Sequence, residues 1–218
     1  MITGGNRGIG KSIAMSFAAT GASVVALGAP DGFPPGTVAD IQAAARSAGQ
    51  PPSAGPQVLT LDLDVTRPQS VEAAADAYWA AVPDAALDLL VNNAGFMTPT
   101  LPVVHTDLDR WWHTFQVNVM GVFLVVQKFA PLLLDTPGGL KTMVNINSVA
   151  AHNLRVNASA YGTSKLAVLK LTEFLLVELA HQGLLAYSVH PGGVMTQLAE
   201  AMPREAQSGR FCLQAKKK

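Results

Sequence analysis

Short apolar runs alternate along the chain with longer segments in which apolar residues recur every three or four positions. The short runs predict buried strands at residues 23–27, 57–61, 87–91, 141–146 and 184–189. The longer segments predict helices at residues 37–48, 68–82, 107–134 and 158–181, and a further helix that starts at the spaced apolar residues Ile9, Ile13 and Phe17. Strands that alternate with helices favour right-handed βαβ crossovers. The pattern therefore predicts an α/β fold with a doubly wound parallel sheet in a single domain.

Polar and small residues follow directly after the predicted strands. They stand at Thr3-Gly4, Asp64, Asn92-Asn93-Ala94-Gly95, Ser148 and Pro191-Gly192. In open parallel sheets, ligands bind beyond the carboxyl ends of the strands, and these ends share one edge. We therefore expect these segments, which are far apart in the sequence, to converge on one site.

The chain opens with a glycine-rich turn, TGGNRGIG at residues 3–10, that leads into a helix. Glycine permits positive φ and lets the backbone approach a ligand closely. The start of the helix offers N–H groups and a partial positive charge to a pyrophosphate. A glycine pattern by itself is also typical of a flexible turn.

Tyr161 and Lys165 lie four positions apart in a predicted helix, and Ser148 stands at the end of the preceding strand. Residues four apart share a helix face, so the ammonium can lie beside the phenol. A nearby cation favours the phenolate and moves the tyrosine pKa from about 10 toward the working range. Ser148 can hydrogen-bond the same reacting oxygen. These residues predict a proton-transfer site for an alcohol or a carbonyl; the alternative is a partly buried ring beside a solvated charge.

Together these motifs resemble the short-chain dehydrogenase/reductase family over residues 3 to about 196. The glycine spacing is similar to that of the family's shorter, single-domain branch, since the longer branch would carry glycine in place of Arg7. The remaining matches are the element Asn92-Asn93-Ala94-Gly95, the active-site residues Asn118, Ser148, Tyr161 and Lys165, and the loop Pro191-Gly192-Gly193-Val194-Met195-Thr196. The resemblance implies a Rossmann-like fold.

The resemblance also implies an NAD(P)(H)-dependent oxidoreductase that interconverts a secondary alcohol and a ketone, with a small-molecule alcohol or carbonyl as substrate. Tyr161 would be the general acid/base, Lys165 would lower its pKa and bind the nicotinamide ribose, and Ser148 would stabilise the oxyanion. Asn118 would hold a water linked to Lys165, unless it is a buried amide that bridges strands. Hydride transfer itself belongs to the cofactor.

The cofactor contacts follow from the same resemblance. The implied binding residues are Thr3, Gly4, Asn6, Arg7, Gly8, Ile9, Gly10, Asp64, Val65, Asn92, Ala94, Gly95, Tyr161, Lys165, Pro191, Gly192, Val194 and Thr196. The second strand ends at residues 27–30 without a charged residue to read the adenosine ribose. Arg7 is the nearby cation that suits a 2′-phosphate, whereas Asp31 lies beyond a proline. We therefore expect NADP rather than NAD.

Two other functions share this fold. A binding or regulatory protein could keep the cofactor fold without turnover, and a non-redox lyase or isomerase could use it for different chemistry. The complete set of Asn118, Ser148, Tyr161 and Lys165 argues against both, whereas the short ends of the chain favour the first.

The amino-acid composition limits the binding partners and the cellular compartment that can be expected. Acidic and basic residues balance at 15 each, which gives no sign of nucleic-acid or acidic-lipid binding. The single Cys212 and the lack of a visible secretory signal favour a reducing, cytoplasmic location. The five histidines show no metal-ligand spacing, so no metal is predicted.

The long apolar helices raise two questions, whether the chain crosses a membrane and whether it forms an oligomer. Residues 117–134 are interrupted by Asn118, Gln127 and Lys128, which favours a buried helix over a membrane span. In the family that the chain resembles, the helices at 107–134 and 158–181 pair with a second subunit. The resemblance therefore implies a homodimer.

The chain departs from the family pattern at both ends. Only Met1 and Ile2 precede the glycine turn, where the family has several apolar strand residues. The dinucleotide-binding and catalytic domain is expected at residues 1–196. A short polar tail at 197–218 then stands where the family has a lid, a helix and a seventh strand. We expect a truncated or alternatively spliced reductase, or an artefact of gene prediction, with lower stability and an uncovered substrate site.

Overall fold

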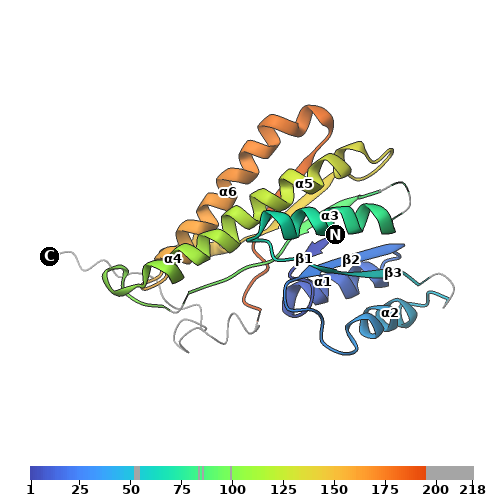
Figure 1. Cartoon of the computed structure of the whole chain (residues 1–218), viewed down its shortest axis with the longest axis horizontal. Coiled ribbons are helices and arrows are strands. Elements are labelled where there is room, and N and C mark those ends of the chain that lie inside the picture. The colour runs from blue at the N-terminus through green and yellow to red at the C-terminus, as the bar shows by residue number, and fades with distance from the viewer. Residues whose placement is uncertain (52–54, 83, 85, 99, 195–218) are drawn as a thin grey trace.

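The computed structural model describes residues 1–51, 55–82, 84, 86–98 and 100–194. At its centre is a six-stranded parallel sheet with the strand order β3-β2-β1-β4-β5-β6 (Figure 1). The strands are β1 (Ile2–Thr3), β2 (Val24–Ala29), β3 (Gln57–Asp62), β4 (Leu89–Asn92), β5 (Thr142–Ile146) and β6 (Leu185–Val189). The order reverses between β1 and β4, which is the topology of a doubly wound sheet. The predicted fold class is confirmed, whereas the expected tail at residues 197–218 lies outside the described residues.

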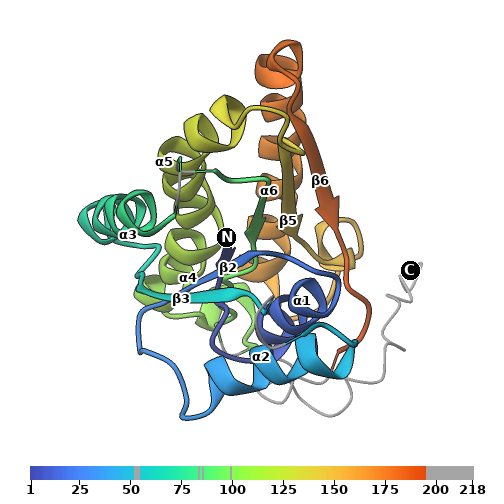
Figure 2. The same ribbon diagram turned by 90° about the vertical axis from the view of Figure 1, so that its right-hand side faces the viewer.

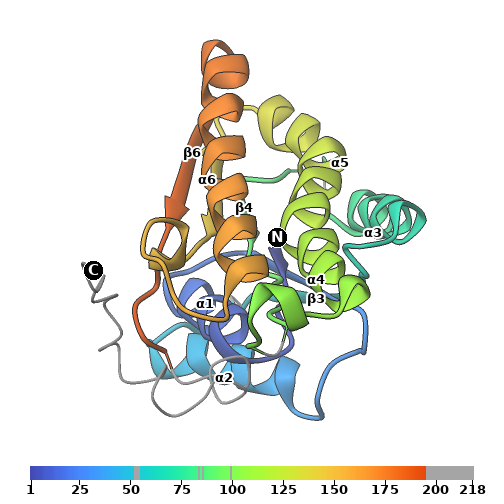
Figure 3. The ribbon, with the colours of Figure 1, turned by 90° about the vertical axis from the view of Figure 1, so that its left-hand side faces the viewer.

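Helices cover both faces of the sheet. They are α1 (Gly8–Ala19), α2 (Thr37–Ser47), α3 (Pro68–Ala81), α4 (Leu108–Phe115), α5 (Gly121–Asp135) and α6 (Ser159–Leu179). α1 and α2 lie on one face, and α3, α5 and α6 lie on the other (Figures 2 and 3). Helices on both sides of a parallel sheet are the arrangement that the alternating sequence pattern predicts.

The central strands send alternate side chains into two apolar layers, as the period of two in a strand requires. Val25 and Leu27 of β2 belong to the layer of α1 and α2, while Ala26 between them joins the layer of α3, α5 and α6. In β4, Val91 belongs to the first layer and Leu90 to the second. Because both faces are buried, these strands appear in the sequence as continuous apolar runs.

The first strand is short but pairs with both of its neighbours. The amino group of Met1 donates to the Leu89 carbonyl at 2.8 Å, and the Val91 N–H donates to the Met1 carbonyl at 2.8 Å. On the other side, the Gly4 N–H donates to the Gly28 carbonyl at 2.8 Å. Burial lowers the pKa of the Met1 amino group to about 5. This segment thus satisfies backbone groups of β2 and β4 that a missing first strand would leave unpaired.

The helix predicted at residues 107–134 is divided by a π-helical turn, Gln116–Met120, between α4 and α5. By length and composition alone, the helical run Leu108–Asp135 could cross a membrane. Its side chains Val122, Val125 and Phe129 are nevertheless buried in the apolar layer on the sheet. This packing agrees with the predicted buried helix.

Candidate active site

The glycine turn forms a close-fitting backbone cradle at the amino end of α1. Gly4 and Gly8 adopt φ angles of +62° and +52°, which side chains disfavour. A side-chain carbon added at Gly10 would lie 2.3 Å from the Gly4 carbonyl oxygen, so this position admits glycine alone. The first N–H groups of an α-helix lack partners within the helix, and the first turn of α1 carries no acidic residue. The cradle is therefore suited to an anion.

Asn93 holds this cradle against β4, a role that sequence analysis did not assign. Its Nδ2 donates to the carbonyls of Thr3 at 2.9 Å and Gly4 at 3.0 Å. In return, the Thr3 hydroxyl accepts from the N–H groups of Asn93 and Ala94, each at 3.0 Å. The signal was present in the Asn-Asn-Ala-Gly motif, but only the fold shows which loop this amide reaches.

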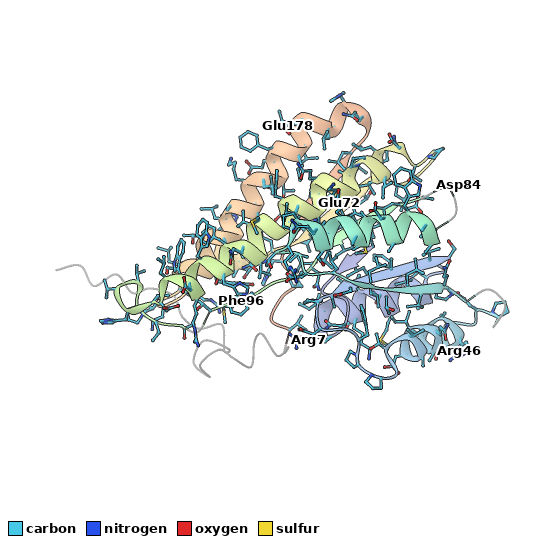
Figure 4. All side chains as sticks on the ribbon, viewed as in Figure 1. Arg7, Arg46, Glu72, Asp84, Phe96 and Glu178 are labelled. Carbon is cyan, nitrogen blue, oxygen red and sulfur yellow. The ribbon has the colours of Figure 1, made fainter. Side chains whose placement is uncertain are left out.

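The remaining predicted cofactor residues near α1 lie around the cradle. Arg7 is exposed at the start of α1 (Figure 4), and the Asn6 side chain donates to the Gly32 carbonyl at 3.2 Å. Asp64 closes its own turn, because its Oδ1 accepts from the N–H of Thr66 at 2.9 Å and from its hydroxyl at 2.7 Å. Val65 is buried. Both residues follow β3 at the edge that the sequence predicts.

Asn118 lies in the π-helical turn and is fully buried. Its Nδ2 donates to the Phe96 carbonyl and to Ser164 Oγ, each at 2.9 Å, and its Oδ1 accepts from the Phe96 N–H at 2.8 Å. Ser164 Oγ donates in turn to the Tyr161 carbonyl at 2.8 Å. Asn118 therefore links the loop after β4 to α6 rather than bridging strands. Its predicted role in holding a water beside Lys165 stays a prediction.

Tyr161 and Ser148 meet at the carboxyl end of β5. Ser148 follows the strand in an extended conformation, and its side chain hydrogen-bonds the Tyr161 hydroxyl. Burial raises the pKa of Tyr161, and this effect outweighs the lowering by the Ser148 hydrogen bond and by the positive charge of Arg155. The expected fall of the Tyr161 pKa is therefore wrong in direction. Sequence reasoning counted a nearby cation but not the loss of water around the phenol.

Lys165 is buried beside Tyr161, with 5% of its surface exposed. Its Nζ donates to the Ile146 carbonyl at 2.9 Å and lies 5.6 Å from the centre of the Tyr161 ring. Burial lowers the pKa of Lys165 to about 8. The alternative of a solvated charge beside the ring is therefore wrong, because this ammonium is anchored inside the protein at the end of β5.

Gly95 and the loop after β6 complete the edge. A side-chain carbon added at Gly95 would lie 3.7 Å from Asn118 Oδ1 and 4.0 Å from Lys165 Nζ, so the bare glycine backbone passes next to both groups. The predicted residues Pro191, Gly192 and Val194 follow β6, and the Val194 N–H donates to the Gly192 carbonyl at 3.2 Å. The predicted contact at Thr196 lies outside the described residues.

The side chain of Asn92 is buried in the core of the sheet. Its Nδ2 donates to Asn145 Oδ1 at 2.8 Å, and Asn145 Nδ2 donates to the Thr172 hydroxyl at 2.8 Å. These buried groups tie β4 and β5 to α6. Asn92 Oδ1 is buried without a hydrogen-bond partner among the described residues. The predicted cofactor contact of Asn92 is therefore left to its backbone.

Comparison with known proteins agrees with this geometry. The model of the family described as short chain dehydrogenase matches residues 1–207. The chain belongs to the short-chain dehydrogenase family. One curated member, "Short chain dehydrogenase mpl6" of Monascus purpureus, is 46% identical over 207 residues, which are 95% of this chain and 68% of that protein.

Solved structures of the family align over most of the chain. A metagenomic short-chain oxidoreductase in complex with NADP has a TM-score of 0.71 at 28% identity and covers 88% of this chain and 80% of its own. The 3-ketoacyl-(acyl-carrier-protein) reductase of Brucella melitensis, complexed with NADH, has a TM-score of 0.72 at 26% identity and covers 87% of this chain and 73% of its own. Both of these structures contain a nicotinamide dinucleotide.

The residues of this short-chain dehydrogenase fit such a cofactor. The cradle of Gly4, Gly8 and Gly10 at the start of α1 suits a pyrophosphate. Lys165 and Tyr161 lie along the same edge of the sheet and offer an ammonium and a hydroxyl for a ribose. In the described parts of the chain, no group of three or more His, Cys, Asp or Glu side chains is arranged to hold a metal ion.

Arg155 emerges from the structure as a determinant of Tyr161 ionisation. Because its positive charge lowers the pKa of Tyr161, the Arg155→Met variant is expected to raise that pKa. Absorbance titration of the phenol measures the shift, after subtraction of a Tyr161→Phe spectrum, because the chain has only three tyrosines. Lys170→Met removes an exposed cation of α6 and is the control, with no expected shift. Equal titration of Tyr161 in the Arg155 variant and the wild type would contradict the prediction.

Proposed function

We propose that this short-chain dehydrogenase is an NADP(H)-dependent oxidoreductase that interconverts a secondary alcohol and a ketone. The observation that carries the proposal is the Ser148 hydrogen bond to the Tyr161 hydroxyl beside the buried ammonium of Lys165. An acid, an oxyanion donor and a cation at one sheet edge are the groups that carbonyl reduction requires from the protein.

The nicotinamide, when bound, supplies the hydride that adds to the carbonyl carbon. Ser148 and Tyr161 both hydrogen-bond the carbonyl oxygen of the substrate. Tyr161 then donates its phenolic proton to that oxygen as negative charge develops on it. The nearby Lys165 ammonium stabilises the tyrosinate that remains.

The pKa directions favour reduction near neutral pH. Burial raises the pKa of Tyr161, so the phenol stays protonated and acts as an acid. Alcohol oxidation needs the tyrosinate and is therefore favoured at higher pH. Burial lowers the pKa of Lys165 to about 8, so its charge, and the support it gives to the tyrosinate, declines above that pH.

The test is oxidation of NADPH and of NADH by the protein against a panel of ketones and aldehydes, with Tyr161→Phe beside the wild type. Turnover by the wild type that the variant lacks supports the proposal. Equal inactivity of both proteins, with cofactor still bound, would favour the cofactor-binding alternative. Conversion of a substrate without consumption of cofactor would favour the lyase or isomerase alternative.

NADP is proposed over NAD because Arg7 is exposed at the cradle, while β2 ends at Ala29 without a charged side chain. Arg7→Ala is expected to weaken NADPH binding about tenfold or more, since hydrogen bonds to charged groups contribute about 1.5–3 kcal/mol. NADH binding should stay within about twofold of the wild type, because NADH lacks the 2′-phosphate. Nicotinamide fluorescence measures both dissociation constants.

Arg46→Ala, on α2, is the matched control for loss of an exposed arginine (Figure 4). It should leave both dissociation constants unchanged. If Arg7→Ala weakened both cofactors equally, Arg7 would not read the 2′-phosphate, and tighter binding of NADH by the wild type would overturn the NADP preference itself.

We also propose that the protein forms a homodimer through α4, α5 and α6. Large apolar side chains are exposed on these helices: Leu108, Trp112, Phe123, Leu166, Phe174 and Val177. Contiguous patches of exposed apolar side chains are typical of protein interfaces. Light scattering in solution tests the proposal, and a monomer at all concentrations would overturn it. A cytoplasmic location is proposed because a single cysteine favours a reducing compartment, and cell fractionation tests it.

A further inference from the structure

Asn147 stands between β5 and Ser148, with 6% of its surface exposed. No role follows for it from the sequence motifs. We propose that Asn147 is a positioning residue: its carboxamide holds Ser148 in register with the turn of α6 that carries Tyr161 and Lys165. This inference rests on the proposed function, because the register matters only if Ser148 and Tyr161 act on one oxygen.

The Asn147 side chain joins three segments of the chain. Its Oδ1 accepts from the Ser148 N–H at 2.8 Å, and its Nδ2 donates to the Lys165 carbonyl at 3.1 Å and to Ser188 Oγ at 2.6 Å. Its own N–H donates to the Val189 carbonyl at 2.7 Å. A primary amide has two donor hydrogens and one acceptor oxygen, and all three are engaged here.

Lys165 is thereby attached to the end of β5 at two points. Its ammonium donates to the Ile146 carbonyl at 2.9 Å, and its own carbonyl accepts from Asn147. Ser148 follows Asn147 in the chain, and its N–H donates to the same Asn147 amide. The planar amide of Asn147 therefore joins Ser148 to the backbone of α6 at Lys165. Because Tyr161 lies one turn earlier on the same helix, this amide also fixes the position of Ser148 relative to Tyr161. Small displacements of reacting groups reduce rates strongly, so this connection should affect turnover.

Asn145 provides a natural comparison, because it lies two residues earlier in β5 and faces the same side of the sheet. It is also buried and also reaches α6, through its bond to the Thr172 hydroxyl at 2.8 Å. Thr172 lies seven residues beyond Lys165, about two helical turns away. The two asparagines therefore anchor the same helix, but only Asn147 touches Ser148 and Lys165.

The experiment compares Asn147→Ala with Asn145→Ala in the full chain. Both variants should lose thermal stability, because each leaves buried polar groups unpaired. Only Asn147→Ala should lower kcat for carbonyl reduction, by about tenfold or more, while the NADPH dissociation constant stays within about twofold. Equal kcat losses in the two variants, or a kcat for folded Asn147→Ala within twofold of the wild type, would overturn the proposal.

Two further measurements apply if Asn147→Ala does not fold or if the wild type shows no turnover. If Asn147→Ala does not fold, Asn147→Asp keeps the shape and the acceptor for Ser148 but removes both donors, and it should lower kcat at an unchanged NADPH dissociation constant. If the wild type shows no turnover, the proposed function fails, and titration of Tyr161 then decides the positioning. Loss of the Ser148 hydrogen bond should raise the pKa of Tyr161 in Asn147→Ala and not in Asn145→Ala. An unchanged titration would overturn the inference.

Discussion

Replacing Tyr161 with phenylalanine is expected to lower kcat for carbonyl reduction by about 10²- to 10⁴-fold, the usual contribution of a positioned acid. The variant loses the hydroxyl that Ser148 contacts but keeps the ring that packs beside Lys165. The NADPH dissociation constant should therefore change by no more than about fivefold, because one neutral hydrogen bond contributes about 1 kcal/mol. Steady-state kinetics and fluorescence titration measure the two quantities separately.

Tyr187→Phe is the matched control, since Tyr187 lies on β6 with 51% of its surface exposed. It undergoes the same chemical change and should keep the wild-type kcat. If kcat of Tyr161→Phe stayed within tenfold of the wild type, Tyr161 would not be the proton donor. The donor would then be sought in the other buried titratable group of the site, Lys165.

Replacing Phe129 with alanine is expected to lower the free energy of unfolding by about 3–5 kcal/mol, as for other large buried aromatic residues. Phe129 of α5 is fully buried and meets the ring of Tyr78 edge to face, with 6.0 Å between the ring centres. Alanine would leave a cavity between α3 and α5 and would remove this ring contact. Chemical denaturation followed by circular dichroism measures the loss.

Trp79→Ala, on α3, is the control for removal of an aromatic ring. Trp79 is 64% exposed, so its loss should change the free energy of unfolding by no more than about 0.5 kcal/mol. Comparable losses in the two variants would show that α5 does not pack on the sheet as described. Such a result would also favour a membrane-spanning role for the helical run Leu108–Asp135, which its length and composition allow.

The order of the elements and the edge that carries the site follow from the sequence. Apolar runs and helical spacing depend on neighbours within a few positions, so β2, β5 and α6 could be located to within two residues. The four-residue spacing of Tyr161 and Lys165 is likewise a local property of a helix. The glycine turn was also predictable, because the ability of Gly4 and Gly8 to adopt positive φ is a property of the single residue.

The interruption between α4 and α5 was not predictable from apolar spacing. The π-helical turn holds Asn118 against Phe96 and Ser164, which come from other segments of the chain. Similarly, Asn147 was assigned no role and the loop that Asn93 reaches was not predicted, since the carbonyls that they bind belong to Lys165 and Thr3, 18 and 90 positions away. Hydrogen bonds of this range exist only once the sheet has brought the segments together.

From the sequence alone, the candidate reacting groups and the sheet edge that carries them were predicted, because both rest on local spacing and residue chemistry. Only the tertiary structure decided how those groups ionise. Burial raises the pKa of Tyr161, against the direction expected from a nearby cation, and lowers that of Lys165. The physical reason is desolvation, which depends on everything packed around a group and not on its neighbours along the chain.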